Sequence, residues 1–194
     1  MKKTLLTLAL VAVTAASFAQ GKISIQNSGR LVTFGTTVKP GDVAGSLVTL
    51  AASPSGATFL VDLFGGSSAG NMILQTTIAM SGSIAGGFGP LSFTSPNLPG
   101  AVQATMQVKI RETGFATAEL AQAGAGYFGF SPIFNFNPSS NPLVFNSLVN
   151  AGGTALSTWA AAPILVNYVP VPEPTSMALA GIGAAAMVIF RRRK

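Results

Sequence analysis

Residues 101–111, AVQATMQVKIR, alternate strictly between apolar and polar side chains, and this pattern constrains the fold more than any other stretch of the chain. A period of two belongs to a β-strand, in which successive side chains point to opposite faces of the sheet. One face would carry Val102, Ala104, Met106, Val108 and Ile110, and the other Gln103, Thr105, Gln107, Lys109 and Arg111. The pattern predicts a half-buried strand of an antiparallel sheet.

Further short apolar segments predict more strands, separated by clusters of Gly, Pro, Ser and Asn such as GGSSAGN and NFNPSSNP. They are residues 22–26, 30–34, 47–51, 57–64, 72–80, 127–130, 143–148 and 164–168, with a hairpin turn at 27–29. The helix pattern is limited to residues 117–123, where Thr117 would cap the first turn and Gly124 would end the helix. We therefore predict an all-β fold, an antiparallel β-sandwich or jelly roll.

The side chains of most catalytic and metal sites are missing from the sequence. The chain has no histidine and no cysteine, so it offers no imidazole base, no thiol nucleophile and no disulfide. Glu112 and Glu119 are the closest pair of carboxylates, and we interpret Glu112 as paired with the neighbouring Arg111 at a strand edge. Asp42 and Asp62 stand alone and are predicted to be solvated. We expect no enzymatic activity, no cofactor and no metal site.

The net charge of +6 does not indicate a nucleic-acid partner. Most of the excess charge lies at the two ends of the chain. Between residues 20 and 171 five basic residues stand against four acidic residues, with no basic stripe among aromatic side chains. A surface that follows a phosphate backbone needs such a stripe. We therefore expect no nucleic-acid binding.

The first nineteen residues have the pattern of a secretory signal peptide. Lys2 and Lys3 precede an apolar run over residues 4–16, and Ser17 and Ala19 are the small residues that signal peptidase reads. The apolar run is too short to span a hydrocarbon core of roughly 30 Å. We predict export and cleavage before Gln20.

The C-terminal residues have the pattern of a membrane segment. Residues 175–190 are uncharged and would form a helix about 24 Å long, a little short for a bilayer but able to span it with local thinning. Arg191, Arg192 and Arg193 follow, and the positive-inside rule would keep them in the cytoplasm. The sequence therefore predicts an inner-membrane-anchored precursor with its body outside that membrane.

Pro172, Glu173 and Pro174 directly precede this apolar segment, and their two prolines favour an extended stretch that a protease can reach. With the apolar helix and the arginine cluster, residues 171–194 resemble the PEP-CTERM sorting domain. The resemblance implies that an exosortase, a membrane-embedded cysteine protease of Gram-negative bacteria, recognises Pro172, Glu173 and Pro174, and that Arg191 to Arg193 hold the substrate in place. It also implies release or attachment at the cell exterior, close to extracellular polysaccharide.

The predicted organisation is a signal peptide at 1–19, a β-sandwich body at 20–168, and a linker and sorting tail at 169–194. The first functional interpretation is a structural protein of the cell surface or extracellular matrix. The alternative is a carbohydrate-binding module, because Trp159 could present an aromatic platform to a sugar ring. An enzyme is the third. The predicted partners are signal peptidase, the exosortase, the inner membrane during transit and extracellular polysaccharide.

Overall fold

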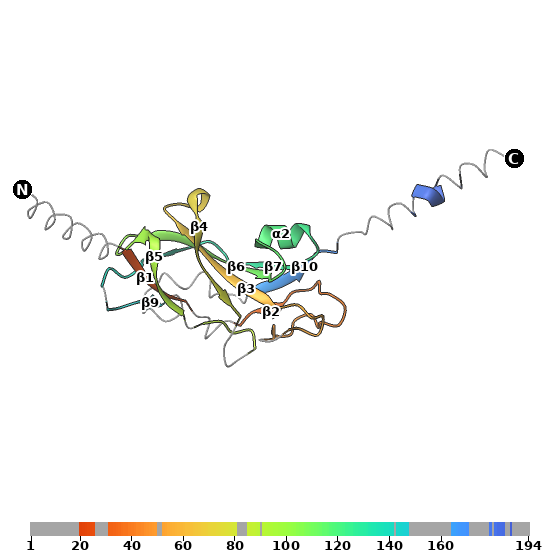
Figure 1. Ribbon diagram of the computed structural model, residues 1–194, viewed down its shortest axis with the longest axis horizontal. Coiled ribbons are helices and arrows are strands. Elements are labelled where there is room, and N and C mark those ends of the chain that lie inside the picture. Colours follow the sequence, from red (N-terminus) through yellow and green to blue (C-terminus); the bar gives the residue numbers. More distant parts are fainter. Residues whose placement is uncertain are drawn as a thin grey trace, which may run out of the picture.

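The computed structural model describes residues 20–25, 31–49, 52–80, 85–89, 91–141, 143–147 and 164–170, together with 179, 181–184 and 187. Strands dominate these residues (Figure 1). The strands are β1 (Gln20–Ile25), β2 (Thr33–Phe34), β3 (Phe59–Gly66), β4 (Ile73–Ala79), β5 (Leu91–Pro99), β6 (Ala104–Glu112), β7 (Tyr127–Phe130), β8 (Phe134–Phe136), β9 (Asn146–Ser147) and β10 (Leu165–Tyr168), with a 3-10 turn η1 (Ala69–Asn71) and a short helix α2 (Ala118–Ala123). The predicted β-rich fold is confirmed.

The larger sheet has the strand order β2-β10-β7-β6-β3-β4, and β8 also pairs with β6. Strand β6 is the predicted alternating strand, and its residues Ala104, Met106, Val108 and Ile110 are buried. Val102 was expected on the same face, but it precedes the strand and is 53% exposed. The alternation therefore predicted the buried face correctly and placed the start of the strand too early.

The smaller sheet has the order β5-β1-β9. Strand β1 pairs antiparallel with β5 and parallel with β9, and in the larger sheet β10 pairs parallel with β2. The prediction of a purely antiparallel fold was wrong at these two pairs. Both involve a strand of two residues, so the parallel pairing covers only a short part of each sheet.

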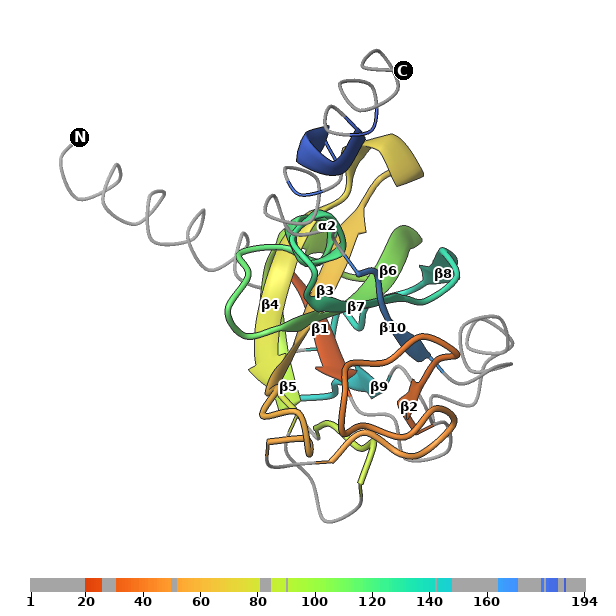
Figure 2. The ribbon, with the colours of Figure 1, turned by 90° about the vertical axis from the view of Figure 1, so that its right-hand side faces the viewer.

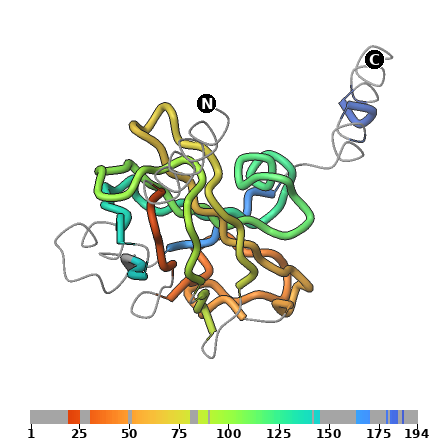
Figure 3. Tube along the Cα trace, turned by 60° about the vertical axis from the view of Figure 1, so that its left-hand side comes forward, coloured from red at the N-terminus to blue at the C-terminus, as the bar shows by residue number. Residues whose placement is uncertain are grey.

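The two sheets share one hydrophobic core. Ile23 and Ile25 of β1 lie in the same buried cluster as Val61 of β3 and Val108 of β6, all four with no exposed surface. At one end of the core, the rings of Phe34, Phe59 and Tyr127 pack against one another in edge-to-face and tilted arrangements, with centroids 5.2 to 6.0 Å apart. The loops of residues 31–49 lie at this end of the body, and the β3–β4 turn with η1 lies at the other (Figure 2 and Figure 3).

Helix α2 covers part of the outer face of the larger sheet. Ala118 and Ala121 pack against Phe128 of β7. The Thr117 hydroxyl accepts a hydrogen bond from the Leu120 amide, and the Gly124 amide donates to the Leu120 carbonyl. The predicted helix, its cap and its end are confirmed.

The other predicted strands agree with the structure to different extents. Strand β7 has the predicted bounds, whereas the segment from residue 47 contributes only an isolated bridge between Leu47 and Thr33 among its described residues. Strands β5 and β8 were not predicted. Strand β5 contains Pro96 and Pro99, which argue against a central strand but are tolerated at a sheet edge, the position that β5 occupies.

Several predicted features lie outside the described residues: the signal peptide at 1–19, the hairpin turn at 27–29 and most of the apolar segment at 175–190. Residues 181–184 of that segment are helical. None of the helices formed by described residues has the length and apolar character required to cross a membrane.

Candidate functional site

The sequence-predicted sorting residues Pro172, Glu173, Pro174, Arg191, Arg192 and Arg193, and the predicted sugar contact Trp159, all lie outside the described residues. The structure instead shows how the body meets the sorting tail. Strand β10 ends at Tyr168, and Val169 and Pro170, which follow it, are exposed. The tail therefore leaves the body at the surface, directly after the last strand.

Strand β10 is an interior strand of the larger sheet, between β2 and β7. Val166 pairs with Phe34, Asn167 with Phe128, and the Tyr168 amide donates to the Thr37 carbonyl at 3.0 Å. None of these backbone pairings involves a residue after Pro170. A cut at the Pro172–Pro174 motif would leave the pairing of β10 unchanged.

At the N-terminal end, a predicted processing site also lies next to an interior strand. Gln20, the first residue after the predicted signal-peptide cleavage, is also the first residue of β1, an interior strand of the smaller sheet. Gly21 is packed so closely that an added Cβ would lie 2.4 Å from Pro138 Cβ. The predicted mature N-terminus is therefore also the first residue of β1.

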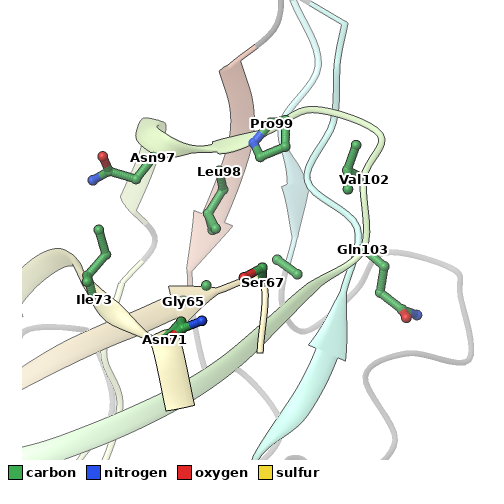
Figure 4. A pocket seen from close by; sticks show the side chains of 11 residues that line it. Gly65, Ser67, Asn71, Ile73, Asn97, Leu98, Pro99, Val102 and Gln103 are labelled. Atoms are coloured by element: carbon green, nitrogen blue, oxygen red, sulfur yellow. The ribbon is translucent and has the colours of Figure 1, made fainter. Parts of the chain in front are cut away.

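A cavity of about 260 Å³ opens between the β3–β4 turn and the connection from β5 to β6 (Figure 4). We call it the turn cavity. Its polar lining side chains are Ser67, Asn71, Asn97 and Gln103. Leu98 points toward Gly65 between them and forms an apolar wall with Ile73 and Val102. The cavity lining contains amides, one hydroxyl and apolar groups, with no charged side chain.

A buried polar pair fixes the walls of the turn cavity. The Gln75 amide donates to the carbonyls of Gly65 and Ile73 at 3.0 and 3.1 Å, and the Ser95 hydroxyl donates to Gln75 Oε1 at 2.7 Å. The Ser95 oxygen also accepts the Leu98 amide at 3.0 Å. One network therefore joins β3, β4 and β5 beneath the cavity. Neither residue stood out in the sequence, because a single Gln and a single Ser carry no motif.

The backbone around the turn cavity leaves little freedom. A Cβ on Gly66 would lie 2.2 Å from the Asn71 carbonyl oxygen, so only glycine fits there. Ala101 in the β5–β6 connection has φ 59, a left-handed conformation that is unfavourable for a residue with a Cβ. Its amide donates to the Pro138 carbonyl at 2.8 Å, which holds this conformation in place.

At the opposite end of the body, Asp42 is a hydrogen-bond acceptor rather than the solvated carboxylate that the sequence predicted. Its carboxylate accepts the Tyr127 hydroxyl at 2.6 Å, the Ser55 hydroxyl at 2.6 Å and the Ser55 amide at 3.0 Å. Burial opposes ionisation of Asp42, but the hydrogen bonds from Ser55 and Tyr127 outweigh it and hold the pKa of Asp42 below its ordinary value. Burial and the bond to Asp42 raise the pKa of Tyr127.

The two glutamates form separate ion pairs. Glu112 binds Lys39 with both oxygens, at 2.8 and 2.6 Å, and accepts the Tyr127 amide at 2.9 Å. Glu119 binds Lys109 at 2.5 Å. Burial of Glu119 raises its pKa, but the hydrogen bond and charge of Lys109, together with hydrogen bonds from the Glu119 backbone and Thr117, outweigh burial and leave the pKa below its ordinary value. Glu112 therefore does not pair with its neighbour Arg111, as the sequence had indicated.

Arg111 pairs with Asp62 instead, with Nε 2.6 Å from Oδ2. Asp62 is 3% exposed and also accepts the Thr77 hydroxyl at 2.5 Å, so the prediction that Asp62 is solvated was wrong. In the part of the chain that the structure describes, no three acidic side chains gather in a group that could hold a metal ion. Six of the described charged side chains of the body form three ion pairs, while Lys22 and Asp42 bind polar groups instead.

Comparison with protein families gives a match to the PEP-CTERM protein-sorting motif over residues 170–194. No curated protein and no solved structure matches the chain. The motif implies a secreted precursor that is anchored in a membrane and then processed by an exosortase-type membrane enzyme. It begins at Pro170, two residues after β10 ends. The last 25 residues of the chain therefore carry a PEP-CTERM sorting motif, which follows closely after the last strand of the β-rich body.

Proposed function

We propose that this protein is a structural component of the cell surface or extracellular matrix of a Gram-negative bacterium, delivered there by an exosortase-type system. The observation that carries the proposal is the position of the sorting motif. It begins at Pro170, which is exposed and lies two residues after the end of β10. A protease can therefore remove the tail without unfolding what it releases.

The body suits a structural role because its buried polar groups bind one another. Arg111, Lys39 and Lys109 are each bound to a carboxylate of another segment. Among the described residues, no buried side-chain nitrogen or oxygen lacks a hydrogen-bond partner. Catalytic sites, by contrast, hold titratable groups ready for a substrate. We infer that the body has a structural role and does not catalyse a reaction.

The test replaces Pro172, Glu173 and Pro174 by alanine in the native host. This change removes the carboxylate and allows the helix to extend upstream, while the apolar length and the basic end are unchanged. We expect the triple variant to accumulate in the inner membrane as a longer chain, while the wild type leaves the membrane shortened. In a host without an exosortase, both forms should stay in the membrane. Equal release of both forms in the native host would refute processing through this motif.

A carbohydrate-binding module is the second candidate, and the turn cavity is the observation that favours it. The cavity combines neutral hydrogen-bonding side chains with an apolar wall, the mixture that small-molecule sites use for orientation and affinity. A displayed body with such a cavity could contact extracellular polysaccharide after sorting. Binding of polysaccharide by the purified protein tests this function.

A further inference from the structure

We propose that the turn cavity binds one ring of an uncharged polysaccharide chain, with the amide of Asn71 facing that ring and the amides of Asn97 and Gln103 at the two ends facing the neighbouring rings. The assignment rests on the second candidate function and names its site and ligand class. It differs from the site that the sequence suggested, the aromatic ring of Trp159.

The first argument is the state of the three amides. Within the described part of the chain, the side chains of Asn71, Asn97 and Gln103 make no hydrogen bond, and all three residues are exposed. Asn97 and Gln103 lie at opposite ends of the cavity, with Asn71 and Ser67 between them (Figure 4). A carboxamide donates and accepts at once, as a sugar hydroxyl does. Asn71 therefore lies where one ring would sit, while the carboxamides of Asn97 and Gln103 point outward from the two ends, where the neighbouring rings of a polysaccharide chain would lie.

The second argument is the apolar wall. Leu98 is 3% exposed and packs toward Gly65, and Ile73 and Val102 are about half exposed beside it, at 48% and 53%. An apolar surface next to amides suits the C–H face of a sugar ring, which is apolar while its hydroxyls point outward. The cavity of about 260 Å³ is slightly smaller than the pockets of roughly 300–1,000 Å³ that enclose drug-sized ligands. It is therefore suited to one ring of a chain that continues into solvent.

The third argument is charge. No Lys, Arg, Asp or Glu side chain lines the cavity. A uronate or sulfated ring would lose hydration without gaining a cation, and a peptide terminus would find no opposite charge. Lys109 and Arg111, which lie on β6 beyond the cavity, are held by Glu119 and Asp62. The lining therefore selects for neutral ligands.

The fourth argument is rigidity. The Gln75–Ser95 network and the close contact of Gly66 with Asn71 fix both walls before any ligand arrives. Binding to fixed walls avoids the entropy cost of ordering a loop, which favours measurable affinity from a small site.

The experiment uses the full chain, purified in a zwitterionic detergent without a sugar headgroup. Its binding to neutral polysaccharides (dextran, mannan and galactomannan) and to acidic ones (alginate and hyaluronate) is measured by affinity electrophoresis. We expect retardation by at least one neutral polymer and by neither acidic one. Asn71→Ala and Gln103→Ala should each weaken that binding about threefold to tenfold, the loss expected for one hydrogen bond. Gln122→Ala, which removes an exposed amide on α2 away from the cavity, is the matched control and should bind as the wild type does.

Each other result overturns a different part of the inference. If Asn71→Ala and Gln103→Ala bind a neutral polymer as the wild type does, the site is wrong although carbohydrate binding stands. If the chain binds only alginate or hyaluronate, the ligand class is wrong. If none of the five polymers is bound, the carbohydrate-binding function itself fails, and the structural proposal is unaffected. Circular dichroism of each variant separates lost binding from lost fold.

Discussion

The Tyr127 hydroxyl donates to Asp42 Oδ2 at 2.6 Å and joins a loop near the start of the body to a strand 85 residues later. The hydroxyl oxygen of Tyr127 also accepts the Lys39 backbone amide at 2.6 Å. The ring of Tyr127 has no exposed surface and packs against Phe34 and Phe59. One side chain thus joins the core to the loops at this end of the molecule, close to where β10 leads into the sorting tail.

Tyr127→Phe should lower the free energy of unfolding by about 1–3 kcal/mol, because the Lys39 amide and the Asp42 carboxylate both lose a partner. Tyr168→Phe is the matched control: Tyr168 also contacts Tyr127, but its hydroxyl makes no hydrogen bond within the described residues. Urea unfolding of the two variants checks this expectation. An equal loss of unfolding free energy in the two variants would show that the hydrogen bonds of the Tyr127 hydroxyl do not stabilise the fold.

Stability should fall in acid, partly through Asp42. Its pKa is lowered in the folded state, so its contribution is complete above the unfolded pKa of about 4 and is lost as the pH falls through the folded value. We expect the wild type to lose more stability than Asp42→Asn between neutral pH and about pH 3, since the amide does not titrate. Urea titrations at both pH values measure the difference. Parallel losses in the two proteins would contradict the assignment to Asp42.

Arg111→Met should destabilise the body by about 3–5 kcal/mol, because it leaves the buried Asp62 carboxylate without its cation. The double variant Arg111→Met/Asp62→Leu should recover much of that loss, since no unpaired charge remains. Glu119→Gln breaks a pair whose glutamate is 53% exposed and should cost less than about 1 kcal/mol. Thermal unfolding of the three variants gives the ranking. A double variant no more stable than Arg111→Met would show that the buried charge is not the cause.

The two faces of β6 should respond differently to the same charge. Val108 has no exposed surface, so Val108→Asp buries an unpaired carboxylate and should cost at least about 3 kcal/mol. Thr105→Asp places the carboxylate on the opposite, partly exposed face of the same strand and should cost far less. Melting temperatures compare them directly, and equal values would mean that the buried face of β6 has been assigned wrongly.

The fold was predictable from sequence where a local pattern and the packing agree. Strand β6 alternates because one face meets the core, and α2 is marked by Thr117 and Gly124 at its ends. Strand β5 was not predictable because Pro96 and Pro99 are tolerated only by its place at a sheet edge. Sequence could not reveal that edge position, which depends on pairing with a strand about seventy residues earlier in the chain.

The polar contacts were less predictable than the strands. Asp62 and Arg111 are 49 residues apart, and only the register of β3 on β6 brings them together. The neighbouring Arg111 and Glu112 suggested a local pair, but adjacent residues of a strand point to opposite faces. The sorting motif was predictable because its information is linear, while the turn cavity depends on two connections that meet only in the folded chain.

The mass of the mature protein tests the central claim, that an exported precursor is trimmed at both boundaries of the folded body. Protein shed from the native host is purified and its intact mass is measured, with the N-terminus sequenced in parallel. The account predicts a chain that begins at Gln20, where β1 begins, and that lacks Arg191 to Lys194. A released chain that still ends in Arg191 to Lys194 would contradict processing of the sorting tail.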